Sequence, residues 1–303
     1  MKAFAPGIYP RSEALVQATR DLDRGRTTQE AVDLQVARDL EQLVQAEQSA
    51  GLDLLVDGML RWQDLFRPLV DQAEGLERGA LTRFLDTNTF YRAPAATSAS
   101  PKLATPLGEE YVAPLPGPRL LTLPSPYALS RGTGASPKTI AESVLRPQLE
   151  ATKAELVVLS EPFLARDEEG SLDGLADALQ TLAGAGPKLA LQITFGDARK
   201  LLEAGLADLP VDGIGIDFYA THVTDVPKGL DKLLLAGVVD SRNSVLEDPR
   251  ELAAFAERLR SERGVEQIAL TPNGDLQYVS QQIAQEKLAR LGRAKTATTE
   301  AAA

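Results

Sequence analysis

Polar side chains follow apolar runs at several places in this 303-residue chain. The clearest case is residues 156–162, where four apolar residues without alternation are followed by Ser160, Glu161 and Pro162. Such a run predicts a strand that is buried on both faces, as in a parallel sheet covered by helices. Binding and reacting groups lie at the carboxyl ends of such strands. Glu161 is therefore a candidate catalytic residue that binds an amine or accepts a proton.

The same arrangement recurs at the other predicted strand ends. The polar residues found there are Arg11, Asp57, Ser125, Glu161, Thr194, Asp217, Asp240, Arg242, Asn243, Asn273 and Asp275. Because the carboxyl ends of barrel strands meet at one mouth, we expect these side chains to converge on a binding cleft. The alternative for each residue is that it caps the following helix, since Asp, Asn and Ser favour that position.

Acid–base chemistry would use the carboxylates and the one histidine. Asp217 and Asp240 are candidate neighbours of Glu161, and carboxylates held close together raise one another's pKa. His222, a few residues after Asp217, is a candidate acid–base group, and a solvated or capping histidine is the alternative.

Arginine and aromatic residues are candidates for binding a substrate. Arg11 and Arg242, in a chain of net charge −11, suggest an anionic ligand group such as a carboxylate. Arg61 and Trp62 follow the second predicted strand and could stack on a flat ring. A lone tryptophan is more often part of a core or an interface, which is the alternative.

Alternating strands and helices must position these groups. A helix is expected over residues 28–50, begun by Thr28 and ended by Gly51. A short first strand precedes residues 5–11, and the other strand candidates are 52–58, 119–126, 156–162, 188–194, 211–217, 233–240 and 267–273. Eight strands alternating with helices predict a single (β/α)8 TIM barrel, an α/β fold, over residues 1–292. A doubly wound open sheet is the competing fold, but no Gly-rich phosphate loop follows the first strand.

Residues from about 80 to 118 interrupt the alternation after the second βα unit. They are rich in proline and contain Asn88 and Tyr91, so we expect an inserted β-hairpin or long loop over one face. Both residues are candidates for substrate binding. The Ala/Thr-rich residues 293–303 are expected to be a disordered tail.

The composition excludes several classes of chemistry and partner. The chain has no cysteine and one histidine, so thiolate nucleophiles, thiolate zinc sites and multi-histidine metal sites are not expected. The acidic net charge disfavours nucleic acid and anionic membranes. No apolar run approaches the length of a membrane span, and the first residues lack the apolar core of a signal peptide, so we expect a cytoplasmic protein.

Several segments resemble the cobalamin-independent methionine synthase family. These are residues 51–64, the Asn-containing segment 86–91, the Leu-Pro-Ser-Pro-Tyr turn at 123–127, the Ser-Glu-Pro turn at 160–162 and the Gly-rich segment 237–243. They span nearly the whole chain in the family's order. The last segment is most similar to the Arg-Asn version found in the family's amino-terminal barrel.

The resemblance implies methyl transfer from methyltetrahydrofolate, or from a corrinoid in short forms, to homocysteine. In the family a zinc ion held by His, two Cys and Glu activates the thiol. This chain departs from that pattern. The His-x-Cys segment is replaced around residues 192–195, the last Cys falls near 273–275, and the histidine after the seventh strand aligns with Arg242.

Three functions remain open at this point. The first is a homologue of the zinc-free amino-terminal barrel, which binds the methyl donor or assists a separate zinc-bearing barrel. The second is a metal-free enzyme like uroporphyrinogen decarboxylase that acts on an anionic substrate. The third is a non-catalytic scaffold subunit. The first two functions both require a small anionic ligand. For the homologue of the amino-terminal barrel, this ligand would be a folate or an amino acid.

Overall fold

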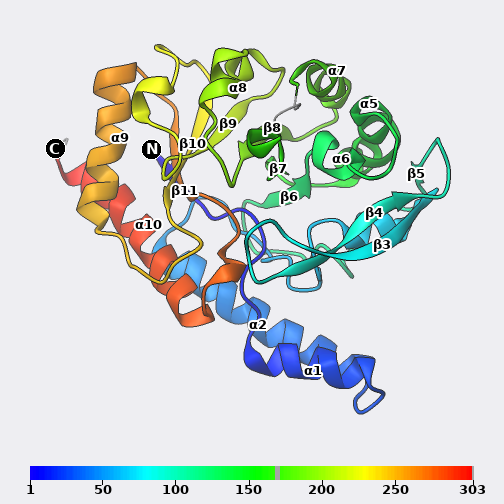
Figure 1. Cartoon of the computed structure of the whole chain (residues 1–303). Coiled ribbons are helices and arrows are strands. Elements are labelled where there is room, and N and C mark those ends of the chain that lie inside the picture. Colours follow the sequence, from blue (N-terminus) through cyan, green and yellow to red (C-terminus); the bar gives the residue numbers. More distant parts are fainter. Residues whose placement is uncertain (168–170, 302–303) are drawn as a thin grey trace.

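A computed structural model describes residues 1–167 and 171–301. Seven strands form one parallel sheet in the order β1-β11-β10-β9-β8-β7-β6. Their bounds are β1 Lys2–Ala3, β6 Leu120–Pro124, β7 Leu156–Glu161, β8 Lys188–Ile193, β9 Gly213–Asp217, β10 Leu233–Val239 and β11 Ile268–Pro272. Figure 1 shows this curled sheet in the middle of the molecule, with helices around it.

The helices connect and cover these strands. The α-helices are α1 Glu13–Asp23, α2 Gln29–Ala50, α3 Arg67–Gln72, α4 Pro126–Ser130, α5 Pro137–Ile140, α6 Arg146–Ala151, α7 Asp173–Leu182, α8 Arg199–Glu203, α9 Pro249–Arg263 and α10 Gln281–Ala301. A π-helical segment, Ala141–Leu145, joins α5 to α6, and short 3-10 turns are η2 Leu164–Arg166, η3 Leu206–Asp208, η4 Val223–Asp225 and η5 Leu276–Tyr278. None of the helices described is long and apolar enough to cross a membrane.

Strand β7 shows why an apolar run without alternation predicts a central strand. Its side chains alternate between two cores: Val157 and Leu159 pack in one hydrophobic cluster, and Leu156 and Val158 pack in another. All four are at most 5% exposed. Burial on both faces therefore replaces the polar–apolar alternation of a half-exposed strand.

The segment expected as the second strand, residues 52–58, makes only one isolated bridge, between Leu55 and Arg119. One reason is that a side chain takes a backbone donor: the Val56 N–H donates to the Glu47 carboxylate at 3.1 and 3.3 Å. The segment still lies between the two edges of the sheet. The Asp53 N–H donates to the Ala3 carbonyl, and the Leu55 N–H donates to the Pro118 carbonyl, at 2.9 and 2.8 Å.

Helix α2 matches the expectation at both ends. Thr28 is its N-cap and accepts the Ala31 N–H at 3.3 Å, and Gly51 ends it in the left-handed region at φ +67°. Helix α1 was not expected, because Leu15 is its only buried residue and the helix rests on α2 at the edge of the molecule. At the other end of the chain, α10 continues past residue 293 to Ala301, so the stretch 293–301 is helical rather than disordered.

Between α3 and β6 the chain leaves the parallel sheet. Strands β3 Leu76–Arg83 and β4 Phe90–Ala96 pair antiparallel, and β2 Ala73–Glu74 pairs with β5 Lys102–Leu103. The turn that joins β3 to β4 lies near the carboxyl ends of the parallel strands. There the Phe84 and Phe195 rings are 5.7 Å apart, and Asp86 pairs with Arg166 at 3.3 Å.

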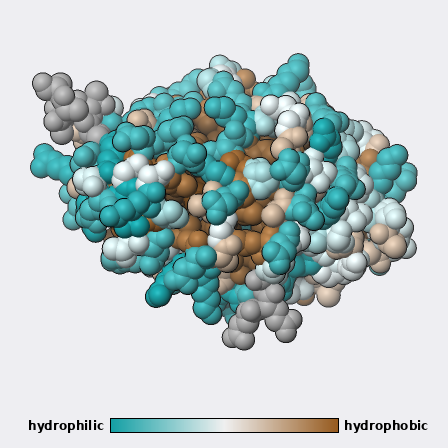
Figure 2. Space-filling view, turned by 90° about the horizontal axis from the view of Figure 1, so that it is seen from above, coloured by the Kyte–Doolittle hydropathy of each residue, from teal (hydrophilic) through white to brown (hydrophobic). Residues whose placement is uncertain are grey.

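One face of the molecule is shown from above in Figure 2. Hydrophilic side chains frame an area in the middle where apolar side chains reach the surface. Such mixed surfaces are usual in folded proteins, because polar atoms are too few to cover the whole surface.

Candidate functional site

The carboxyl ends of β9, β10 and β11 bring together a polar cluster. The Asn273 side-chain amide donates to Asp217 Oδ1 at 3.0 Å and to Asp240 Oδ1 at 3.4 Å. Arg242 Nη2 lies 3.2 Å from Asp217 Oδ2, and Asn243 Nδ2 donates to Asp240 Oδ2. Five residues expected at strand ends thus meet in one hydrogen-bonded group, which we call the strand-end cluster.

Arg242 is neutralised inside the strand-end cluster. Its guanidinium lies between two carboxylates, because its Nε is also 3.6 Å from Asp240 Oδ1. It rests over the Phe195 ring with 5.2 Å to the centroid. The expectation that Arg242 binds an anionic ligand group is therefore not supported by its contacts, since its charge already has two partners.

Asp217 is the most buried carboxylate of this cluster, at 1% exposed. Burial raises its pKa and the charge of Asp240 adds to the effect, whereas hydrogen bonds from Asn273 and the Tyr219 N–H and the charge of Arg242 act in the opposite direction. A carboxylate in this state can hold or release a proton, but its access to a ligand is restricted by the side chains around it.

Glu161 and Ser125 form a second, separate group at the ends of β7 and β6. The Ser125 hydroxyl donates to Glu161 Oε2, and the N–H groups of Phe163 and Leu164 donate to Oε1 at 2.8 and 2.9 Å. Ser125 also caps α4 by accepting the Ala128 N–H at 2.9 Å. Burial raises the pKa of Glu161 although these three donors oppose it.

Both residues therefore stabilise the turns that follow their strands. Glu161 and Ser125 are each 0% exposed, so neither side chain faces an open space at the mouth. The capping alternative weighed for strand-end residues describes Ser125 directly, and Glu161 performs the same task for η2.

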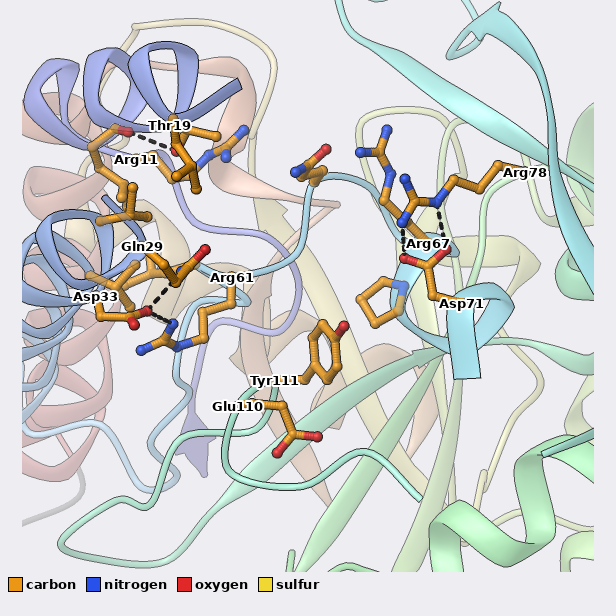
Figure 3. A pocket seen from close by; sticks show the side chains of 17 residues that line it. Arg11, Thr19, Gln29, Asp33, Arg61, Arg67, Asp71, Arg78, Glu110 and Tyr111 are labelled. Atoms are coloured by element: carbon orange, nitrogen blue, oxygen red, sulfur yellow. Dashed lines mark hydrogen bonds and ion pairs between the residues drawn. The ribbon is translucent and has the colours of Figure 1, made fainter. Parts of the chain in front are cut away.

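An open cavity lies elsewhere, beside α1, α2 and α3, and holds about 500 Å³. Four arginines line this arginine cavity: Arg11, Arg61, Arg67 and Arg78. Figure 3 shows Arg61 reaching toward Asp33 on one side, with Arg67 and Arg78 beside Asp71 on the other. Its arginines come from the segments that follow β1 and residues 52–58, from α3 and from β3, so distant parts of the sequence build it.

Three of the four arginines have carboxylate partners. Arg61 pairs with Asp33, Arg78 pairs with Asp71, and Arg67 Nε lies 3.6 Å from Asp64 Oδ2. The Arg67 Nε is buried and makes no hydrogen bond within the described part of the chain. Arg11 has no hydrogen-bonding or ion-pairing side-chain partner among residues 1–167 and 171–301, which distinguishes it from the others.

The local sequence holds Arg11 in place without neutralising it. Ser12, the N-cap of α1, takes both oxygens of the nearby Asp39, through its N–H at 2.9 Å and its hydroxyl at 2.8 Å. Burial lowers the pKa of Arg11, and the charge of Arg67 lowers it further, while Asp39 opposes both. Two arginines that repel one another beside an open cavity favour the arrival of an anion.

Three other expected site residues, Asp57, Trp62 and Tyr91, have structural partners, and a fourth, Asn88, is exposed. Asp57 accepts the N–H groups of Met59 and Ala113 at 2.9 and 3.0 Å. Trp62 is 1% exposed, and its indole donates to the Tyr111 carbonyl at 3.0 Å, so it is a core residue. Tyr91 packs on Phe66 and Phe84, and Asn88 is exposed in the turn between β3 and β4.

His222 is an exposed capping residue. Its ring accepts the Thr224 N–H at 3.3 Å, and Asp225 completes the reciprocal contact at the start of η4. The capping alternative therefore describes the contacts of His222 better than the acid–base role does.

Sequence reasoning did not find Arg67 and Arg78. Neither follows a strand of the parallel sheet, which was the signal used to choose candidates. The Arg67-Pro68 pair could have indicated the start of α3, because proline is common in the first turn of a helix. The pair therefore predicts an arginine at the amino-terminal end of that helix.

The donor set does not fit a thiolate-bound zinc ion. The sequence has no cysteine, and its single histidine caps η4. Among the residues described, no group of three or more His, Cys, Asp or Glu side chains could hold a metal. The strand-end cluster instead places the Arg242 guanidinium between its two carboxylates.

Solved structures of B12-independent methionine synthases have a similar overall fold. The structure from Shewanella sp. aligns over 91% of this chain and 92% of its own with a TM-score of 0.74 and 16% identity. The putative enzyme from Listeria monocytogenes aligns over 98% and 97% with a TM-score of 0.75 and 15% identity. At this identity the likeness concerns the fold.

The sequence comparisons name the same group of proteins. Residues 139–264 match the family described as "Cobalamin-independent synthase, N-terminal domain". The 5-methyltetrahydropteroyltriglutamate–homocysteine methyltransferase of Mycobacterium leprae is 30% identical over 57% of this chain, which spans only 26% of that enzyme. The methionine synthase of Saccharolobus islandicus is 22% identical, over 93% of this chain and 90% of its own. The chain is therefore similar to the cobalamin-independent methionine synthases in both sequence and fold.

Proposed function

We propose that this protein is a methyltransferase-related, methionine-synthase-like barrel that binds the anionic methyl donor in the arginine cavity and assists a separate zinc-bearing barrel. The observation that carries the proposal is Arg11, a cation without an anionic partner in the described structure, beside Arg67 and a cavity of about 500 Å³. The donor named for the mycobacterial relative is a triglutamate, whose tail carries several carboxylates.

The chemistry of this chain supports binding rather than thiol activation. Guanidinium groups recognise carboxylates through paired, charge-assisted hydrogen bonds. Arg11 and Arg67 would take two carboxylates of the tail, and the pairs Arg61–Asp33 and Arg78–Asp71 would keep the walls rigid. Homocysteine activation would fall to the partner barrel, since no thiolate zinc site can form here.

We also infer that the sheet and the segment around Leu55 form a closed eight-membered ring of (β/α)8 type. Hydrogen bonds from Asp53 to Ala3, from Leu55 to Pro118 and from Leu120 to Leu55 support this, since they join the two edge strands through one segment. Closure would fix β1 and residues 52–58, the two segments that lead into Arg11 and Arg61.

A scaffold function without ligand is the second candidate, and the filled mouth favours it. Glu161, Asp217 and Asn273 are at most 3% exposed, so the place where barrel enzymes usually bind substrate is occupied by side chains. A metal-free enzyme of the uroporphyrinogen decarboxylase type would need that mouth open, so these contacts weigh against it.

Calorimetric titration distinguishes these candidates. We expect 5-methyltetrahydropteroyltriglutamate to bind the wild-type protein and homocysteine not to bind it. Arg11→Gln removes one charged contact worth about 1.5–3 kcal/mol, so the donor's Kd should rise by roughly ten- to a hundredfold. The control is Arg199→Gln, an exposed arginine of α8 that pairs with Glu203. Absence of donor binding would favour the scaffold.

A further inference from the structure

A second cavity, of about 480 Å³, lies between the carboxyl ends of β9 and β10 and the start of α9, and we call it the α9 cavity. It shares no lining residue with the arginine cavity. Aromatic and aliphatic side chains form most of its wall, and the Phe218 and Phe255 rings meet edge to face with centroids 4.9 Å apart. The function proposed above makes no use of it.

Two large side chains at its rim are unusually exposed. Tyr219 is 51% exposed and Val245 is 70% exposed, although both line the cavity. Exposed apolar groups around a hollow commonly mark a binding site, because filling the hollow removes them from water. The wall therefore suits a ligand with a compact apolar body.

The charges at the cavity are all negative. Glu247, Asp248 and Glu251 line it, and no lysine, arginine or histidine does so in the described structure. Glu247 is already neutralised by the buried Lys287, whose Nζ lies 3.0 and 3.1 Å from its two oxygens. Asp248 caps α9 by accepting the Arg250 N–H at 2.8 Å.

Glu251 is the carboxylate left for a ligand. It has no hydrogen-bonded or ion-paired partner within the part of the chain that the structure describes. A carboxylate beside aromatic rings is an arrangement that recognises organic cations, because the ring faces and the carboxylate both attract positive charge. An anionic ligand, such as the folate-type donor, would be repelled here.

We propose that the α9 cavity binds a small organic amine, with its apolar body against Phe218, Tyr219 and Phe255 and its ammonium group toward Glu251. This site is independent of the arginine cavity in position and opposite to it in charge preference. It also touches the strand-end cluster, because the Tyr219 hydroxyl lies 3.3 Å from Glu247 Oε1, which accepts the Asp240 N–H at 2.8 Å. Binding of a ligand in the α9 cavity should therefore change the environment of Asp240.

The test uses 2-phenylethylammonium as the probe, titrated into the ¹⁵N-labelled full-length protein at fixed ionic strength. We expect saturable amide shifts around residues 218–219 and 245–255, with a Kd on the order of a millimolar for a ligand of this size. Neutral 2-phenylethanol should bind about two- to fivefold more weakly, as an exposed ion pair contributes little more than that. Ethylammonium, which lacks the ring, should give no saturable shift.

Charge variants make the test specific to this site. Val245→Lys should weaken probe binding and Val245→Glu should strengthen it, each by about two- to fivefold, without affecting folding because Val245 is exposed. Glu251→Gln should weaken it similarly, whereas Glu257→Gln on the same helix should not, since Glu257 does not line the cavity. Unsaturable shifts, equal affinity for the amine and the alcohol, or indifference to both Val245 variants would overturn the proposal.

Discussion

Replacing Glu47 by glutamine is expected to remove a large part of the pH dependence of stability. Glu47 is a fully buried residue of α2, and its carboxylate accepts a hydrogen bond only from the Val56 N–H in the described structure. Burial raises its pKa to about 9; the hydrogen bond from Val56 opposes this, and the nearby charge of Asp57 adds to it. The folded protein therefore keeps a proton on Glu47 at neutral pH.

The sign of the effect follows from proton binding. An unfolded glutamic acid has a pKa of 4.5, so between pH 4.5 and about 9 the folded state binds more protons than the unfolded state. The free energy of unfolding must then fall as the pH rises through this window. The full difference corresponds to roughly 6 kcal/mol at 1.36 kcal/mol for each pH unit. Local opening that lets water reach the charge limits the loss, so we expect about 2–4 kcal/mol between pH 5 and pH 9.

Urea unfolding at pH 5, 7 and 9 measures this directly. The free energy of unfolding of Glu47→Gln minus that of the wild type should increase by about 2–4 kcal/mol from pH 5 to pH 9. The reason is that glutamine stays neutral and can still accept the Val56 N–H. Glu41→Gln, at an exposed position of the same helix, serves as the control and should show no such trend. Parallel stability curves for the wild type and Glu47→Gln would refute the reasoning.

Three further substitutions test the packing around the proposed sites. Gly58→Ala should lower the free energy of unfolding by about 2–3 kcal/mol in urea titrations, since the residue has φ +66° and a Cβ would lie 2.6 Å from a leucine methyl group. The control is Gly51→Ala, where φ is +67° but the space is open, and this substitution should cost about 1 kcal/mol. Glu161→Leu should cost about 3–6 kcal/mol by thermal or urea unfolding, because three buried donors lose their acceptor, and a loss below 1 kcal/mol would contradict the capping role. Lys287→Met should cost about 3–5 kcal/mol by leaving Glu247 unpaired, and adding Glu247→Leu should restore part of that loss if the pair is coupled.

The central strands could be predicted from the sequence because burial on both faces leaves a clear signal. Residues 156–161 are apolar throughout their first four positions, and the structure places them in β7 with side chains in two cores. Residues 52–58 carry the same signal but form one isolated bridge. Sequence patterns did not reveal that the buried Glu47 carboxylate would take a backbone donor from this segment.

Candidate site residues could be predicted from the sequence only where they directly follow a strand of the parallel sheet. Asp217, Asp240 and Asn273 end neighbouring strands and meet as expected, because a parallel sheet brings those ends to one edge. The arginine cavity was predicted only in part: Arg11 and Arg61 were candidates, whereas Arg67 and Arg78 were missed because they lie on α3 and β3, outside the parallel sheet. The side-chain partners of Arg242 were also unpredictable, because they depend on where the loop after β10 turns.

The central claim is that Arg11 and its neighbours bind the anionic tail of the methyl donor. The most direct measurement is the ratio of Kd values for the monoglutamate and triglutamate forms of 5-methyltetrahydrofolate, in the wild type and in Arg11→Gln. We predict that the triglutamate binds the wild type at least about tenfold more tightly than the monoglutamate, because the extra carboxylates reach the arginines, and that Arg11→Gln brings the two values close together. Equal affinities in the wild type, or a ratio unchanged by Arg11→Gln, would contradict the claim.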